Sequence, residues 1–178
     1  MLTLIDMNVY TNLARQSIAY YFKNKKVMLT PDDLPINLLN CRAGTFVSLH
    51  NKDGALRGCI GTLIPTKKNI AQEIIYNALA AAFDDNRFEP LQEKELDSLV
   101  FSVDVLSEPE PTNSIKELNP KKYGVIVQTK DGRSGVLLPN LEGIDSVEQQ
   151  ISIACQKAEI DPNKDKISLF RFTVERHE

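Results

Sequence analysis

The sequence predicts an α+β protein with a mostly antiparallel, curled, barrel-like sheet and flanking helices. Three observations support this prediction. Asp-Gly pairs at 53–54 and 131–132 lie between stretches of alternating polarity, and such a pair is a strong hairpin signal. An amphipathic helical pattern and one further strand follow each hairpin. The strands and helices do not alternate strictly, as they would in a parallel doubly wound sheet.

The chain has 178 residues, which suits one domain. A chain of this length can bury roughly 70% of its unfolded surface without help from disulfides or metals. Because the hairpin–helix–strand order occurs twice, we predict a single domain over residues 1–178. Its internal repeats would span roughly residues 44–107 and 122–176.

Composition excludes several classes of function. The net charge is −3 and the pI is about 5.5, which argues against a bulk electrostatic grip on nucleic acid. Three widely spaced cysteines fit a reducing cytosol, so we predict a cytoplasmic protein. With two histidines and no Cys-x-x-Cys pair, we predict no metal site and no cofactor. Residues 1–6 lack the pattern of a signal peptide, and no apolar run approaches the ~20 residues of a membrane span.

In the first half of the chain, apolar residues at three- and four-residue spacing predict a helix over about residues 7–24. Two prolines predict a loop at 30–40, and alternation predicts strands at 45–50 and 55–63. Asn69 is the predicted N-cap of a helix that runs to Phe83, before the stop at Pro90.

The second half is predicted to begin with a short helix at 91–96 and a strand at 98–106. Two prolines then indicate a rigid connector at 107–112. Strands are expected at 123–128, 134–138 and 167–174, and a capping box at Ser146 begins a helix that ends near Ala158.

The segment Arg57–Gly61 contains the residues most typical of a functional site. On an alternating strand, Arg57, Cys59 and Gly61 share one face, so a permanent cation lies beside a thiol. We expect Gly61 to leave open space beside them and Gly58, on the other face, to permit close approach of a helix or a bulge. Such a site could bind an anion, or Cys59 could act as a nucleophile. A small buried cysteine is an equally common use of such a position.

The hairpin register decides which residues of the preceding strand join this site. A two-residue turn at Asp53-Gly54 places Ser48 opposite Cys59 and His50 opposite Arg57. A four-residue loop keeps the same faces together, whereas a three-residue loop brings Leu49 beside Arg57. We favour the first two, which add Ser48 as a binding residue. His50 becomes a candidate base for Cys59 only within hydrogen-bond reach.

The segment Asp84–Phe88 is the second candidate region. Asp84 and Asp85 follow a helix C-terminus, where the helix dipole disfavours acidic residues. They are expected to pair with Arg87 or Arg57. For Arg57, a salt bridge that fastens the hairpin to the helix end is favoured over recognition of an anion. Structural pairing is favoured over catalysis, although Asp84, Asp85, Arg87 and Phe88 remain candidate binding residues.

Several segments together resemble the AMMECR-type domain family, whose prokaryotic members are called AmmeMemoRadiSam system protein A. The matching segments are Leu56–Gly61, Ala80–Phe88 with Pro90, Val103–Ser107 with Pro109, Gly135 with Leu137–Pro139, and Cys155–Ala158. The chain lacks the tryptophan that many members carry before the last strand. The resemblance implies a curled sheet built from two repeats and genomic company with a Memo-like protein and a radical SAM protein. The resemblance does not indicate a particular reaction.

Three hypotheses for function follow. The first is a binding or accessory protein that holds a small anionic molecule or a peptide carboxylate in a pocket at Arg57 and Cys59 and presents it to a radical SAM partner. The second is an enzyme that uses Cys59 as a nucleophile or covalent carrier. The third, ranked last, is a nucleic-acid-associated module that uses a basic cluster, which comprises Lys121, Lys122, Lys130 and Arg133.

Overall fold

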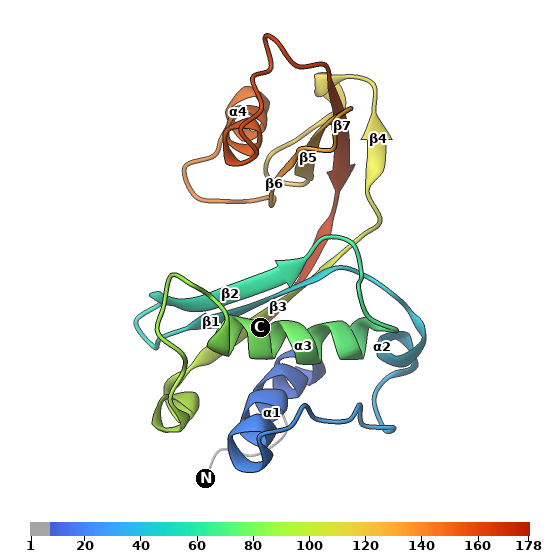
Figure 1. Cartoon of the computed structure of the whole chain (residues 1–178). Helices are drawn as coiled ribbons and strands as arrows, with labels where there is room; N and C mark the ends of the chain where they lie inside the picture. Colours follow the sequence, from blue (N-terminus) through green and yellow to red (C-terminus); the bar gives the residue numbers. More distant parts are fainter. Residues whose placement is uncertain (1–7) are drawn as a thin grey trace. The chain divides into compact units, whose positions relative to one another are not determined.

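A computed structural model describes residues 8–178 (Figure 1). The chain forms two compact units. Unit 1 runs to Leu106 and takes in Glu175–Glu178, and unit 2 comprises Ser107–Val174. The prediction about a signal peptide at residues 1–6 lies outside the described residues.

Unit 1 is a four-stranded antiparallel sheet with helices on one face (Figure 1). Its helices are α1 (Val9–Asn24), α2 (Ile36–Asn40), α3 (Ile70–Phe83) and the 3-10 helix η1 (Glu93–Ser98). Its strands are β1 (Thr45–His50), β2 (Leu56–Thr62), β3 (Val100–Leu106) and β8 (Val174–His177), in the order β2-β1-β3-β8.

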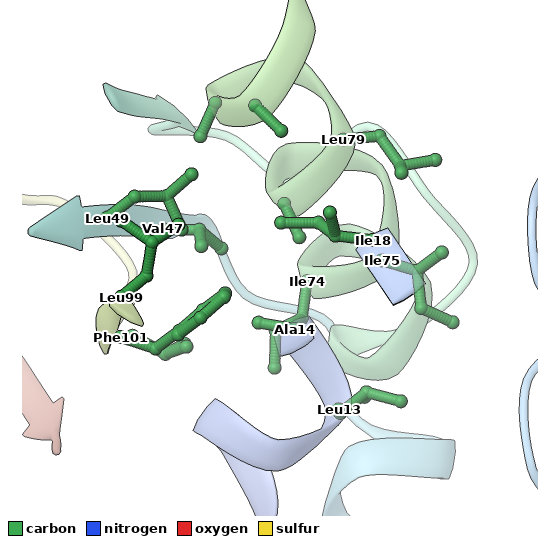
Figure 2. Close-up of a cluster of buried hydrophobic side chains, with 14 of the residues drawn as sticks. Leu13, Ala14, Ile18, Val47, Leu49, Ile74, Ile75, Leu79, Leu99 and Phe101 are labelled. Atoms are coloured by element: carbon green, nitrogen blue, oxygen red, sulfur yellow. The ribbon is translucent and has the colours of Figure 1, made fainter. Parts of the chain in front are cut away.

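The core of unit 1 lies between the sheet and helices α1 and α3. Val47 and Leu49 of β1 are fully buried there, together with Ile74 of α3 and Ile18 of α1 (Figure 2). Alternate residues of β1 face away from the helices and are only partly buried. The sheet therefore has an apolar helix-covered face and an opposite face that carries polar side chains.

A buried carboxylate fixes the start of α3 to the sheet. Glu73 is 1% exposed and accepts hydrogen bonds from the Thr62 hydroxyl at 2.6 Å and from the backbone N–H groups of Thr66 and Lys67 at 2.8 and 2.7 Å. The Thr66 hydroxyl adds a fourth at 2.9 Å. These bonds compensate the burial of Glu73 and fix the loop between β2 and α3.

Unit 2 is a second four-stranded antiparallel sheet with one long helix. Its strands are β4 (Glu110–Thr112), β5 (Gly124–Thr129), β6 (Ser134–Leu137) and β7 (Ile167–Phe172), in the order β4-β7-β5-β6. Its helices are η2 (Ile115–Glu117) and α4 (Val147–Lys157). Val125 and Val127 of β5 pack with Ala154 of α4 in its core.

Three predicted elements differ from the structure. The predicted loop at 30–40 contains α2, and the predicted connector at 107–112 contains β4. Pro111 fits in β4 because that strand lies at the sheet edge, where a missing N–H costs little. The final segment forms two strands, β7 and β8, and β8 joins the sheet of unit 1 rather than that of unit 2.

The mixed, mostly antiparallel fold is confirmed. The strands are divided between two sheets, and no closed barrel is present among residues 8–178, so the barrel-like curvature stays a prediction. No helix in this part of the chain combines the length and apolar character needed to cross a bilayer.

Candidate functional site

The hairpin register confirms one predicted pair and corrects the other. Ser48 lies opposite Cys59, as predicted, but His50 lies opposite Leu56 rather than Arg57. The reason is an irregularity in the β1–β2 ladder at Leu49 and His50, which leaves Arg57 as an extra residue in β2. A bulge of this kind has no signal in the polar–apolar alternation.

Arg57 is held by Glu95 and not by Asp84 or Asp85. Its guanidinium forms two bonds to the Glu95 carboxylate, at 2.8 and 3.1 Å. Both side chains are largely buried, at 15% and 28% exposure, and the bond to Arg57 lowers the pKa of Glu95. Arg57 thus fastens the hairpin to η1. Its charge is compensated by the Glu95 carboxylate and is not available to the Cys59 thiol.

The Cys59 thiol is partly exposed and forms a hydrogen bond with Ser48. The distance from Ser48 Oγ to Cys59 Sγ is 3.1 Å across the β1–β2 pair. Both side chains lie on the sheet face opposite α3. Cys59 is therefore neither a core residue nor a fully exposed one.

Asp85 and Arg87 occupy the free edge of β2. Asp85 Oδ2 accepts the backbone N–H of Cys59 at 2.9 Å, and Arg87 Nη2 donates to the backbone carbonyl of Cys59 at 3.3 Å. The two side chains also bind one another at 2.7 and 2.9 Å. An edge strand normally leaves such backbone groups unpaired, and here an ion pair takes the place of a neighbouring strand.

This ion pair shifts the protonation equilibria of both partners. The Asp85 side chain is 3% exposed, and its hydrogen bonds from Arg87 hold its pKa far below the ordinary value. The pKa of Arg87 is raised, chiefly by the same bond to Asp85. Asp85 is therefore an ionised carboxylate at neutral pH, fixed beside the Cys59 backbone.

The polar face of the sheet continues across β3 with two residues that the sequence analysis missed. Ser102 lies opposite Ser48, and Asp104 lies opposite Phe46, so both share the face of Cys59. Asp104 is 3% exposed and receives two bonds of 2.8 Å from Arg176 of β8. We call Ser48, Cys59, Ser102 and Asp104 the Cys59 face.

Arg176 is a second cation of unit 1 that is held by a buried carboxylate. Its pKa is raised mainly by the hydrogen bonds to Asp104. The guanidinium that contacts Cys59 is that of Arg87, at the backbone carbonyl. Arg57 forms a structural salt bridge, as favoured from the sequence, but with Glu95 rather than with Asp84 or Asp85.

The two glycines of the motif serve close packing. A Cβ on Gly58 would collide with the backbone carbonyl of Ala81 in α3, which agrees with the predicted close helix approach. The expectation of open space at Gly61 is wrong, because the ring of Phe46 covers that position. Phe46 lies opposite Gly61 in the ladder, and only the register reveals this contact.

The remaining candidates lie around the site without joining it. His50 is at the end of β1, paired with Leu56 and Val100, and no hydrogen bond joins it to Cys59 among the described residues. Asp84 is the exposed C-cap of α3. The centroid of the Phe88 ring lies 5.4 Å from the Arg87 guanidinium carbon.

One sequence signal could have revealed the missed residues. Ser102 and Asp104 alternate with the buried Phe101 and Val103, so a carboxylate was placed on the polar face of an otherwise apolar strand. Arg176 carried no comparable signal, because its partner depends on the order of strands in the sheet. Within residues 8–178, no group of three or more His, Cys, Asp or Glu side chains has the geometry to hold a metal ion.

Unit 2 presents apolar residues at the positions that match the Cys59 face. Gly135 of β6 meets the carbonyl of Ala154 in α4, as Gly58 meets that of Ala81. When Gly135 is aligned with Gly58, Ile126 has the ladder position of Ser48, and Val136 has the ladder position of Cys59. Phe170 and Phe172 take the positions of Ser102 and Asp104. The same backbone pattern therefore carries a polar face in unit 1 and an apolar one in unit 2.

The comparisons with known proteins show the family to which the chain belongs. The family model of AMMECR1 matches residues 11–177, so the chain belongs to the AMMECR1 family. A protein of Thermotoga maritima is 50% identical over 98% of this chain and 99% of its own length. A longer protein of Clostridium acetobutylicum is 46% identical over 97% of this chain, which spans 36% of that protein.

A solved structure supports the fold. The crystal structure of the uncharacterised protein PH0010 from Pyrococcus horikoshii is similar to this chain with a TM-score of 0.83 and 32% identity. The match covers 94% of this chain and 88% of that one. The predicted family resemblance is thus confirmed.

Proposed function

We propose that this protein is a binding or accessory protein that acts through the Cys59 face and works with a Memo-like protein and a radical SAM protein. The observation that carries the proposal is the contrast between the units. Polar side chains on a sheet face cost stability compared with apolar ones that could pack. Unit 2 has apolar residues at all four matching positions, so the polar set in unit 1 is not required by the backbone pattern.

The structure revises which residues would contact a ligand. Arg57 and Gly58 support the hairpin, through Glu95 and through the close contact with α3. Ser48 and Cys59 offer partly exposed polar atoms, and Arg87 lies at the strand edge next to them. The choice of these two partners is based on the genomic company that the family resemblance implies. The cysteine usage supports a reducing, cytoplasmic setting.

An enzyme that uses Cys59 as nucleophile is the second candidate. The hydrogen bond that Ser48 donates to the Cys59 sulfur favours it, because this bond holds a partly exposed thiol in one orientation. The third hypothesis, a nucleic-acid module, has less support. Arg133 is paired with Asp131 and Asp165, and Lys121 with Asp145, so these charges of the basic cluster are compensated.

The proposal includes one domain over residues 1–178, with repeats at roughly 44–107 and 122–176 and barrel-like curvature. Each unit has a hairpin, then a helix, then a strand. In each, the residue after the close-packed glycine has its carbonyl capped by a cation: Arg87 for Cys59 and Lys157 for Val136, at 3.3 and 3.2 Å. A shared capping device of this kind supports descent from one duplicated unit.

The test uses the purified protein with the Memo-like and radical SAM proteins encoded by the same genome. Complex formation is followed by light scattering after size-exclusion chromatography, and the turnover of each partner is measured with and without this protein. We expect association or a changed partner rate, lost in the double variant Ser48→Ala with Cys59→Ala and retained in Lys23→Gln on the helix side. No association and no change in rate would reject the proposal.

Two substitutions separate binding from nucleophilic catalysis. Cys59→Ser keeps a small polar group that can bond to Ser48 but removes the thiol nucleophile. A binding role predicts that this variant retains most function, whereas the enzyme hypothesis predicts a loss of several orders of magnitude.

A further inference from the structure

Strand β6 lies at the edge of the sheet of unit 2 and turns part of its backbone away from β5. The Thr129 N–H donates to the Arg133 carbonyl at 2.9 Å, so these two residues form a hydrogen-bonded pair at the end of the ladder. Hydrogen-bonded and non-hydrogen-bonded pairs alternate along an antiparallel ladder. The N–H and C=O groups of Ser134 and Val136 therefore point outward from the sheet edge.

The edges of the two units are closed to different degrees. In β2 both outward groups of Cys59 are occupied, the N–H by Asp85 and the carbonyl by Arg87. In β6 the Val136 carbonyl accepts one bond, from the Lys157 ammonium at 3.2 Å. No side chain in the described part of the chain takes the place of Asp85 at the Val136 N–H. Such an edge is a template for one more strand.

The lysine that covers β6 is easily displaced. Lys157 is the last residue of α4 and is exposed, and among the residues that the structure describes it has no carboxylate partner. Its ammonium is carried on a flexible stem and can turn to another acceptor, whereas Arg87 in unit 1 is fixed by a carboxylate that is 3% exposed. A strand that approaches β6 can therefore take over the Val136 carbonyl and offer Lys157 a new acceptor.

The two faces of β6 define the side chains that an added strand needs. Gly135 faces α4, where it meets the Ala154 carbonyl, and Val136 faces the opposite side beside Ile126 and is partly exposed. A residue paired with Val136 would extend this apolar row. The next residue of the added strand would lie on the α4 side, near Lys157, where a carboxylate complements the unpaired cation.

We infer that β6 is a docking edge for an extended segment of a partner protein, which adds a fifth antiparallel strand with an apolar side chain beside Val136 and an acidic one beside Lys157. In this mode main-chain bonds give affinity and alternate side chains give specificity. A second copy of the chain fits less well, because pairing β6 with itself about Val136 brings two Lys157 ammonium groups to one face. The inference goes beyond the proposed function and uses no residue of the Cys59 face.

The test titrates the isotope-labelled full chain with synthetic eight-residue peptides that have blocked ends, and follows the backbone amide signals by NMR. The parent peptide alternates valine with threonine and carries glutamate at one central threonine position. A second peptide has lysine in place of this glutamate. Two more copies of the parent carry backbone N-methyl groups, on the valines in one and on the intervening residues in the other. The valines are the residues whose N–H groups would face β6.

We expect the parent peptide to shift the Ser134 and Val136 amide signals with a Kd of about 0.05–1 mM. The lysine peptide should bind about three- to tenfold more weakly. N-methylation of the valines should abolish binding, and N-methylation of the intervening residues should not. Lys157→Glu should reverse the preference between glutamate and lysine peptides, whereas Lys116→Glu, in η2 after the opposite edge strand, should leave it unchanged.

Three results overturn the inference: no shift of the Ser134 and Val136 signals with any peptide at about 2 mM, binding that survives N-methylation of the valines, or a charge preference that Lys157→Glu does not change. Signals of these two residues that move with protein concentration alone, together with dimers in light scattering, would show that a second copy occupies the edge, and would also overturn it. None of these results concerns the Cys59 face, so the proposed function is tested separately by partner association and turnover.

Discussion

Asp85 takes the place of a neighbouring strand for Cys59: its Oδ2 accepts the Cys59 backbone N–H at 2.9 Å. The same carboxylate orients Arg87, which donates to the Cys59 carbonyl. Since Ser48 binds the thiol from the opposite side, the backbone and side chain of Cys59 are fixed by three residues. A cysteine fixed in this way has a defined orientation towards any ligand on that face.

The substitution Asp85→Asn should lower the free energy of unfolding by about 2 kcal/mol, because a buried carboxylate that accepts several bonds is replaced by a weaker acceptor. Urea unfolding at pH 7 measures the effect. The matched control is Asp84→Asn, at the exposed neighbouring position, which should change stability by less than about 0.5 kcal/mol. Equal effects of the two substitutions would contradict the assigned role.

The contribution of Asp85 should also depend on pH. The Arg87 guanidinium holds the pKa of Asp85 below its ordinary value of about 3.9, so on acidification the unfolded chain takes up the proton first. The stabilisation is complete above that ordinary value and decreases as the pH falls below it. The stability difference between the wild type and Asp85→Asn should thus shrink between about pH 5 and pH 2. A constant difference across this range would argue against the ion pair.

Arg57 is expected to be a structural residue. Arg57→Gln removes the bidentate bond to Glu95, which should lower the unfolding free energy by about 1–2 kcal/mol and leave the iodoacetamide rate at Cys59 in the folded protein within twofold of the wild type. A double-mutant cycle with Glu95→Gln measures the coupling. A large fall in the rate of Cys59 alkylation, without a loss of stability, would show that Arg57 belongs to the functional site.

The close contacts of Gly58 and Gly135 predict matched effects in the two units. An added Cβ meets a helix carbonyl in each case, and a backbone atom cannot rotate away as a side chain can. Gly58→Ala and Gly135→Ala should each cost about 1–3 kcal/mol. Chemical denaturation of both variants checks this, and Ala55→Ser, in the exposed turn, is the control. A neutral Gly58→Ala would mean that α3 can move away from β2 at no cost.

Local patterns predicted most of the fold. The two Asp-Gly turns, the capping residues Asn69 and Ser146 and the alternation of β1 and β5 specify elements through neighbouring residues, and all of them are present. The strands β4 and β8 were missed because their partners lie far along the chain, and three or four residues carry too little pattern.

The site was only partly predictable for the same reason. The Ser48–Cys59 pair depends on a short hairpin, and the sequence predicted it. The bulge at Arg57 and the pairing of Asp104 with Arg176 depend on a ladder defect and on the order of strands in the sheet. Neither is encoded by the identity of adjacent residues.

Glu73 provides a test of the polar contacts that fix α3 to β2. Glu73→Gln keeps the size of the side chain but removes the charge that strengthens all four bonds. Its amide NH2 group must face either the two backbone N–H groups or the Thr62 and Thr66 hydroxyls, which would then have to accept rather than donate. We expect a loss of about 2–3 kcal/mol in unfolding free energy. The exposed Glu89→Gln is the control, and thermal unfolding at constant pH compares the two. A loss below about 0.5 kcal/mol for Glu73→Gln would show that the loop does not need the carboxylate.

The contrast between the units leads to a prediction about function and stability together. The double variant Ser48→Ile with Cys59→Val copies the residues that unit 2 has at the matching positions. Since the same ladder geometry accommodates Ile126 and Val136, we expect the variant to fold and its unfolding free energy to equal or exceed that of the wild type, by up to about 1 kcal/mol. Association with the partners, or the change in their turnover, should be lost. If the variant unfolds, the polar pair has a structural role. If it folds and keeps full function, the Cys59 face is not the functional surface of the protein.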